Sequence, residues 1–108
     1  MQEGMLQTGI KALGKGKVGK RKDQYVLYFN NDTTELLAPY AHTKAILHFK
    51  DPPIAVVVSL VIDRSFTPPR VAAFLPKALN PTWGKFYGRD VIVIIELIGN
   101  PPPPGKGA

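Results

Sequence analysis

The sequence predicts a mainly β fold, in which two pseudo-symmetric β-β-α-β units with two short helices form one small barrel. Short segments rich in Val, Ile, Phe and Tyr alternate with Gly, Pro and Asn turn signals, which is typical of strands. An order of strand, short helix and strand occurs twice along the chain. The 108 residues, 44% of them hydrophobic, are enough for one compact core and too few for two domains.

The strands follow from the apolar runs between turn signals. The expected strands are residues 5–13, 24–29, 45–49, 54–62, 70–75 and 91–98. Within 24–29 the sequence YVLYF places Tyr25, Leu27 and Phe29 on one face and Val26 and Tyr28 on the other, because side chains alternate along a strand. One aromatic side chain of this strand is therefore expected to face away from the core.

Two short helices are expected. The first covers residues 32–37, where Asp32 and Glu35 have the spacing of a capping box. The second begins at Asn80, a residue favoured as an N-cap, with Pro81 at the first helical position. Gly88 provides a left-handed residue that can end this segment.

The two units match in their apolar positions and chain breakers rather than in residue identity. The matched pairs, each 46 positions apart, are 25–29 with 71–75, Leu37 with Trp83, Tyr40 with Phe86, and 45–49 with 91–95. Two units related by a pseudo-twofold axis can interleave their strands into one closed barrel, which leaves no exposed sheet edges. The side chains of Leu37 and Trp83 are expected to be buried at equivalent positions of this barrel.

The domain limits follow from this repeat. Residues 1–100 are expected to form a single domain, with the first unit at about 5–50 and the second at about 51–100. The segment 101–108 holds four consecutive prolines and is expected to be a disordered tail, because proline cannot donate a backbone hydrogen bond.

Composition excludes several classes of protein. The chain has no cysteine, which rules out disulfides, Cys-ligated metal centres and a thiol nucleophile. The longest apolar runs, 54–62 and 91–98, are shorter than the roughly 20 residues of a membrane-spanning helix. The N-terminus has no apolar block after a basic one, so that no secretory signal is expected. These features predict a cytoplasmic protein that does not bind membranes.

The net charge of +6 is concentrated in the basic segment 11–22. Its candidate phosphate contacts are Lys15, Lys17, Lys20, Arg21 and Lys22. Clustered cations bind nucleic acid effectively because they release counterions from it, and the glycines between them let the backbone follow a curved polyanion. The alternatives are a flexible solubilising arm and, less favoured, contact with an anionic membrane surface.

Catalytic and metal-binding patterns are not found. His42 and His48 are the only histidines, and zinc would require further ligands. Asp63, Asp90 and Glu96 accompany no hydrolase, phosphate-loop or dinucleotide motif. The sequence therefore predicts a protein that is not an enzyme and that needs no cofactor and no metal.

Residues 70–97 resemble the swapped-hairpin motif of the AbrB, SpoVT and MraZ-like DNA-binding domains. Leu75-Pro76-Lys77 at the end of one strand and Gly88-Arg89-Asp90-Val91 at the start of the next carry this resemblance. It implies a barrel of the swapped-hairpin or cradle-loop type, with two motifs in one chain, that presents basic residues to the DNA major groove. The contacts that it implies are Arg70, Lys77 and Arg89, with Lys20, Arg21 and Lys22 as the equivalent edge of the first unit.

These observations predict a nucleic-acid-binding protein, with double-stranded DNA as the favoured ligand in a transcription-regulator or chromatin role. Aromatic residues lie close to lysines and arginines along the chain, which also fits a small barrel that binds single-stranded DNA or RNA, such as a ribosome-associated protein. A self-associating structural protein is the third class. Because both units are present in one chain, a monomer is expected to fold without a partner.

Overall fold

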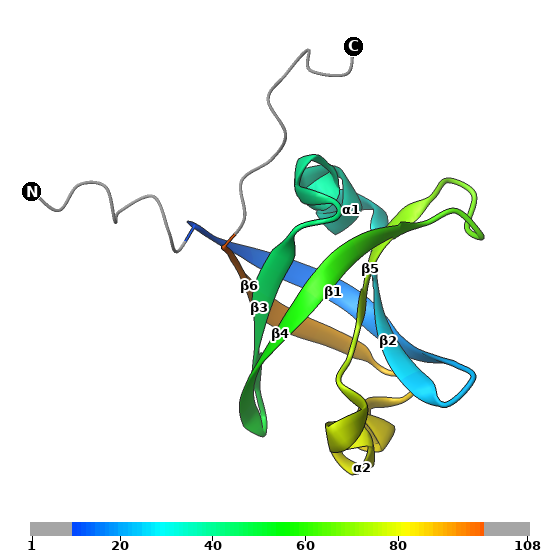
Figure 1. Cartoon of the computed structure of the whole chain (residues 1–108), viewed down its shortest axis with the longest axis vertical. Helices are drawn as coiled ribbons and strands as arrows, with labels where there is room; N and C mark the ends of the chain where they lie inside the picture. The colour runs from blue at the N-terminus through cyan, green and yellow to red at the C-terminus, as the bar shows by residue number, and fades with distance from the viewer. Residues whose placement is uncertain (1–9, 99–108) are drawn as a thin grey trace, which may run out of the picture.

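The structure, a computed structural model, describes residues 10–98, and in it six strands close into one antiparallel barrel (Figure 1). The strands are β1 (Ile10–Arg21), β2 (Gln24–Phe29), β3 (Lys44–Lys50), β4 (Pro53–Asp63), β5 (Arg70–Phe74) and β6 (Asp90–Leu97). Their order around the barrel is β1-β2-β5-β4-β3-β6. The mainly β barrel with two short helices that the sequence predicts is confirmed.

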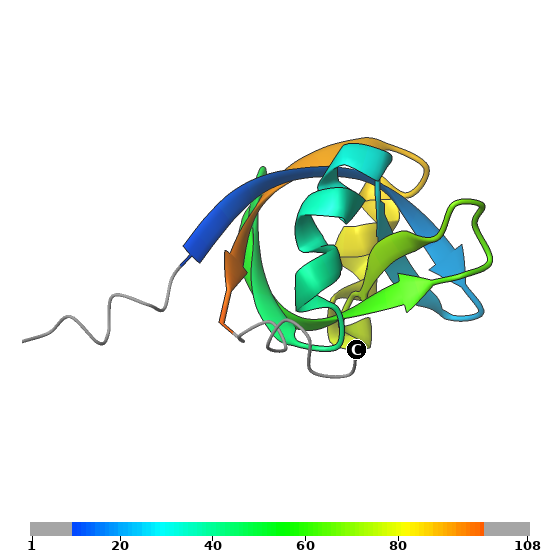
Figure 2. The same ribbon diagram turned by 90° about the horizontal axis from the view of Figure 1, so that it is seen from above.

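The helices lie at opposite ends of the barrel (Figure 1). Seen from above, α1 lies across one opening, with α2 behind it (Figure 2). The helical segments are α1 (Asn31–Leu37), α2 (Asn80–Trp83) and the 3-10 turns η2 (Ala38–Tyr40), η3 (Lys77–Leu79) and η4 (Gly84–Phe86).

The predicted caps are wrong in two cases. Asn30, not Asp32, caps α1: its side-chain oxygen accepts a hydrogen bond from the Thr33 N–H at 2.9 Å. Asn80 is the first residue of α2 rather than its cap: its side-chain nitrogen donates to the Asp23 carbonyl at 3.1 Å, and its side-chain oxygen accepts no hydrogen bond from the helix. Gly88 does adopt the left-handed conformation, with φ of 76°.

The strand pairing has the twofold symmetry that the repeat predicts. Exchanging β1 with β4, β2 with β5 and β3 with β6 leaves the order around the barrel unchanged. Leu27 pairs with Ala73 and His48 pairs with Ile94, and each pair joins equivalent residues of the two units. The pseudo-twofold axis therefore passes through both pairs, and the strands of the two units interleave.

The core fills the barrel and the space under both helices. Leu37 of α1 and Trp83 of α2, the equivalent residues of the two units, are both fully buried, as predicted. The Trp83 ring packs against Phe49 and Phe86. Its Nε1–H donates to the Pro76 carbonyl at 2.8 Å, which satisfies the one polar atom of this side chain.

The basic segment is a strand, so the interpretation as a flexible arm is wrong. Residues 11–21 belong to β1. The expected strand 5–13 overlaps β1 only from residue 10, because residues 5–9 lie outside the described residues. The tail 101–108 also lies outside them. Gly14, Gly16 and Val18 are buried and alternate with the exposed Lys15 and Lys17. This period of two is that of a strand with one buried face.

The glycines of β1 allow close packing, and their replacement tests this account. A Cβ at Gly16 would collide with the Tyr28 carbonyl oxygen of β2, and a paired backbone has little freedom to move away. Gly16→Ala is expected to lower the free energy of unfolding by about 1–3 kcal/mol. Denaturant titration measures this change.

Gly84→Ala is the matched control, because a Cβ there meets only the end of the Tyr25 side chain, with the hydroxyl at 3.3 Å. This variant is expected to unfold close to the wild-type midpoint. Equal midpoints for the Gly16 and Gly84 variants would contradict the close approach of β1 to β2.

Candidate nucleic-acid interface

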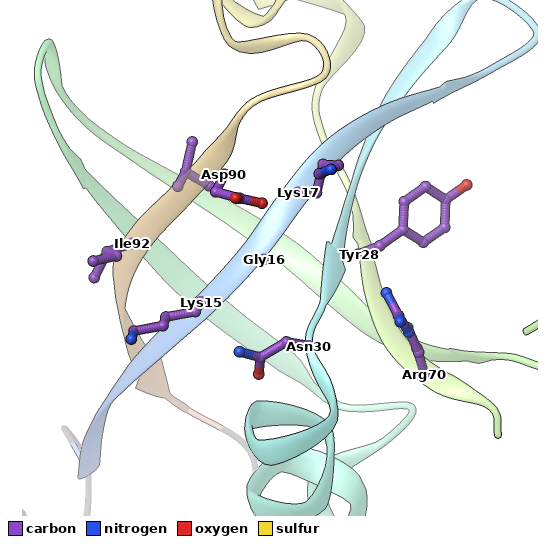
Figure 3. Close-up of a pocket in the computed structure, with 9 residues that line it drawn as sticks. Lys15, Gly16, Lys17, Tyr28, Asn30, Arg70, Asp90 and Ile92 are labelled. Carbon is purple, nitrogen blue, oxygen red and sulfur yellow. The ribbon is translucent and has the colours of Figure 1, made fainter. Parts of the chain in front are cut away.

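Three of the predicted contact residues line one groove on the outer face of the barrel. Lys15 and Lys17 extend from β1 and Arg70 from β5, around a hollow of about 500 Å³ (Figure 3). The remaining side chains of the lining are Tyr28, Asn30, Asp90, Val91 and Ile92. The groove thus crosses four neighbouring strands, from β6 through β1 and β2 to β5.

The strand register brings these residues together. Lys17 lies opposite Tyr28 of β2 on one side and opposite Asp90 of β6 on the other. The Asn30 N–H donates to the Lys15 carbonyl at 2.9 Å, which places Asn30 beside the other end of the groove. The side chains are therefore positioned by backbone pairing between distant segments of the chain.

The groove carries an excess of positive charge. It is lined by three cationic side chains and one carboxylate, that of Asp90. Lys15 and Lys17 are exposed and form no ion pair with another described residue. The Arg70 guanidinium lies 4.8 Å from the centre of the Phe66 ring, a cation–π contact that orients it without neutralising it.

Tyr28 forms part of the groove wall, and its ring is held in place. Its ring meets that of Phe66 edge to face, with centroids 5.0 Å apart. Gly19 of β1 lies beneath it, and a Cβ there would approach the ring to 2.8 Å. Tyr28 is thus the aromatic residue of β2 on the outer face, as the alternation predicts.

Arg21 is occupied by contacts within the fold. Its guanidinium lies 3.2 Å from the Asp63 carboxylate and also donates to the Ser65 hydroxyl. The Ser65 hydroxyl, which donates to Asp63 at 2.6 Å, holds the pKa of that carboxyl below its ordinary value against the opposing effect of burial, and Arg21 lowers it further. Arg21 therefore ties the β1–β2 turn to the β4–β5 loop.

The other predicted contacts lie outside the groove. Lys20 lies 5.2 Å from the centre of the Tyr25 ring, and Lys22 occupies the β1–β2 turn with φ of 57°. Lys77 forms an exposed ion pair with Asp23 at 3.4 Å. Arg89 is exposed, and its carbonyl accepts a hydrogen bond from the Val18 N–H.

The lining also holds residues that were not predicted as contacts, among them Asn30 and Asp90. Asp90 lies just before the expected strand 91–98, and Asn30 lies just after the expected strand 24–29. Their place in the groove follows from their pairing with β1. The available sequence signal was the alternation of Gly with Lys in GKGKV, which predicts that the lysines share one face.

The described residues hold neither a cluster of metal ligands nor a long apolar helix. Within residues 10–98, no three His, Asp or Glu side chains gather where they would hold a metal ion. His48 instead lies 3.0 Å from the Glu96 carboxylate on the outer surface. No described helix is long and apolar enough to span a bilayer.

Comparison with known proteins gives no assignment: no family model, no curated protein and no solved structure matches this chain.

Proposed function

We propose that the chain is a nucleic-acid-binding protein whose phosphate contacts include Lys15, Lys17 and Arg70. The observation that carries this proposal is their convergence, from two strands far apart in the sequence, on one groove. The backbone of each of these residues is already ordered by strand pairing. Binding therefore costs less conformational entropy than it would for lysines on a flexible arm.

A polyanion suits this surface better than a single small anion. Outward side chains two residues apart on a strand are about 7 Å apart, and β1 presents Lys11, Lys15 and Lys17 on its exposed face. A ligand with regularly repeated phosphates can contact several of these cations at once. Release of its counterions adds to the affinity.

Double-stranded DNA, in a regulatory or chromatin role, is the ligand that the Leu75-Pro76-Lys77 and Gly88-Arg89-Asp90-Val91 resemblance favours. Lys20, Lys22 and Arg89 are exposed and would supply phosphate contacts beyond the groove. Such contacts position a duplex without reading its sequence.

The test is the salt dependence of binding. Fluorescence anisotropy with end-labelled oligonucleotides, measured between about 50 mM and 200 mM salt, is expected to show affinity falling linearly on a double-logarithmic plot. Absence of binding to DNA and RNA at the lowest salt would overturn the proposal.

Self-association is the second candidate function, and one observation favours it. Leu13, Val57, Ile92 and Ile94 are exposed on the outer face of the barrel, with Leu13 63% exposed. Leu13 and Ile94 are paired across β1 and β6, so the apolar surface is continuous there. Exposed apolar patches of this kind occur at protein interfaces.

The closed barrel predicts a monomer, because one chain already supplies both units. Sedimentation velocity at micromolar concentration is expected to show a folded species with the mass of one chain. An obligate dimer, dissociated by Ile94→Lys but not by Leu36→Lys on α1, would favour self-association through the apolar surface instead.

A further inference from the structure

We infer that the groove binds a single-stranded segment of nucleic acid, with a base against Tyr28 and backbone phosphates on Lys15 and Lys17. This inference rests on the proposed function and names the form of nucleic acid that the groove accepts.

The shape of the site favours a single strand. A duplex keeps the faces of its bases stacked inside, so it can offer phosphates to the cations of the groove but no base face to Tyr28. Lys15 and Arg70 lie on opposite sides of the groove, with Asn30 between them (Figure 3). An unpaired strand can enter this hollow with its phosphates toward the cations and a base toward the wall.

Tyr28 supplies a stacking surface whose position is fixed. Its edge-to-face contact with Phe66 and the close approach of Gly19 restrict the ring, while the side chain remains partly exposed in the groove lining. Bases of a single strand stack on such rings irrespective of sequence. In a duplex the faces of the bases are covered by their neighbours.

The carboxylate of Asp90 in the lining favours a ligand that offers bases as well as phosphates. This carboxylate lies beside three cations and would repel a phosphate placed against it. A carboxylate can instead accept hydrogen bonds from the amino groups of exposed bases. The Asn30 side-chain nitrogen can donate to acceptors on base edges while its oxygen caps α1. The mixed lining therefore matches a ligand that offers phosphates and bases together.

Arg70 extends the same surface on the other side of Tyr28. Its guanidinium lies over the Phe66 ring at 4.8 Å. The opposite face of the guanidinium can then stack on a base, and its N–H groups can donate to a phosphate. Tyr28, Phe66 and Arg70 thus form one connected aromatic and cationic cluster at the groove wall.

A competition experiment tests the inference. A labelled single-stranded DNA of about 12 nucleotides is displaced by unlabelled DNA of the same sequence, its RNA counterpart, the matched duplex and a mononucleotide. Either single strand is expected to displace it at concentrations about tenfold or more below the duplex. Displacement by duplex or mononucleotide at the concentration of the single strand would overturn the inference.

Variants of Tyr28 provide the second readout. Tyr28→Ser is expected to weaken single-strand binding about tenfold or more and to leave duplex binding nearly unchanged, while Tyr28→Phe keeps wild-type affinity because it retains the ring. Tyr87→Ser is the control, because Tyr87 is 58% exposed but lies outside the groove lining. Melting curves identify any variant that does not fold. If Tyr28→Ser does not fold, Tyr28→Leu replaces it, because Leu fills much of the same space without an aromatic ring and is expected to show the same loss of single-strand binding.

The outcomes separate this inference from the proposed function. Equal losses for Tyr28→Ser and Tyr87→Ser, with salt-dependent binding retained, would refute single-strand binding in the groove and leave nucleic-acid binding standing. Absence of binding to every nucleic acid at low salt would refute both.

Discussion

Trp83→Ala is expected to lower the free energy of unfolding by about 3–5 kcal/mol, a large part of the roughly 5–15 kcal/mol that stabilises a domain. The Trp83 side chain is fully buried and packs against Phe49 and Phe86. Its removal leaves a cavity under α2 and takes away one of the two hydrogen bonds that the Pro76 carbonyl accepts, the other coming from the Leu79 N–H. Urea denaturation followed by circular dichroism measures the loss.

Two further variants control this prediction. Leu36→Ala removes an apolar side chain that is 51% exposed on α1, so its midpoint is expected to stay close to the wild-type value. Leu37→Ala, at the position equivalent to Trp83, is expected to cost about 2–5 kcal/mol. A cooperative Trp83→Ala variant with an unchanged midpoint would show that α2 does not close the core.

Combined replacement of Lys15, Lys17 and Arg70 by Gln is expected to give the largest loss of binding. The slope of log affinity against log salt should flatten by about 0.7 per lost contact on single strands and by about 0.9 on duplex DNA. Thermal stability should change little, because none of the three side chains belongs to the core and Arg70 loses only its cation–π contact with Phe66. Anisotropy titrations at several salt concentrations give both the affinity and the slope.

A matched variant removes the same charge elsewhere. Lys44, Lys50 and Lys85 are exposed and do not line the groove, so their combined replacement by Gln tests the effect of net charge alone. It is expected to retain most of the salt slope. Equal flattening by the two triple variants would mean that diffuse positive charge, and not the groove, binds the ligand.

The 46-residue shift predicted from the sequence relates the second and third strands of the two units and their helices. The first strands of the two units are related by a different shift, and the strand pairing shows why. Val18 of β1 pairs with Leu27, and Leu60 of β4 pairs with Ala73. Val18 and Leu60 are thus equivalent although they are 42 positions apart rather than 46. The difference of four equals the extra length of the β4–β5 loop, six residues against two in the β1–β2 turn.

The basic segment was misinterpreted because its glycines were taken as a sign of flexibility. In the barrel, Gly14 and Gly16 lie where Ile95 and the Tyr28 backbone leave no room for a Cβ. That requirement comes from neighbouring strands, and local propensity does not contain it. The same glycines therefore mark close packing, and the lysines between them are held on the outer face.

The sequence was enough to predict which residues carry the positive charge of the candidate site, but not which of them lie together. Lys15 and Lys17 were identified from charge, yet their approach to Arg70 depends on the strand order β1-β2-β5. The engagement of Arg21 by Asp63, 42 positions away, is likewise a tertiary contact. Only the closed barrel separates the cations that are available to a ligand from those that stabilise the fold.

The most direct test of the account is an amide chemical-shift titration of the labelled protein with a short single-stranded oligonucleotide at low salt. The account predicts that the shifts concentrate on the groove, at Lys15, Lys17, Tyr28, Asn30 and Arg70, and spare the apolar surface around Ile94. Shifts confined to Lys77, Arg89 and the turn at Lys22, with the groove unchanged, would contradict it.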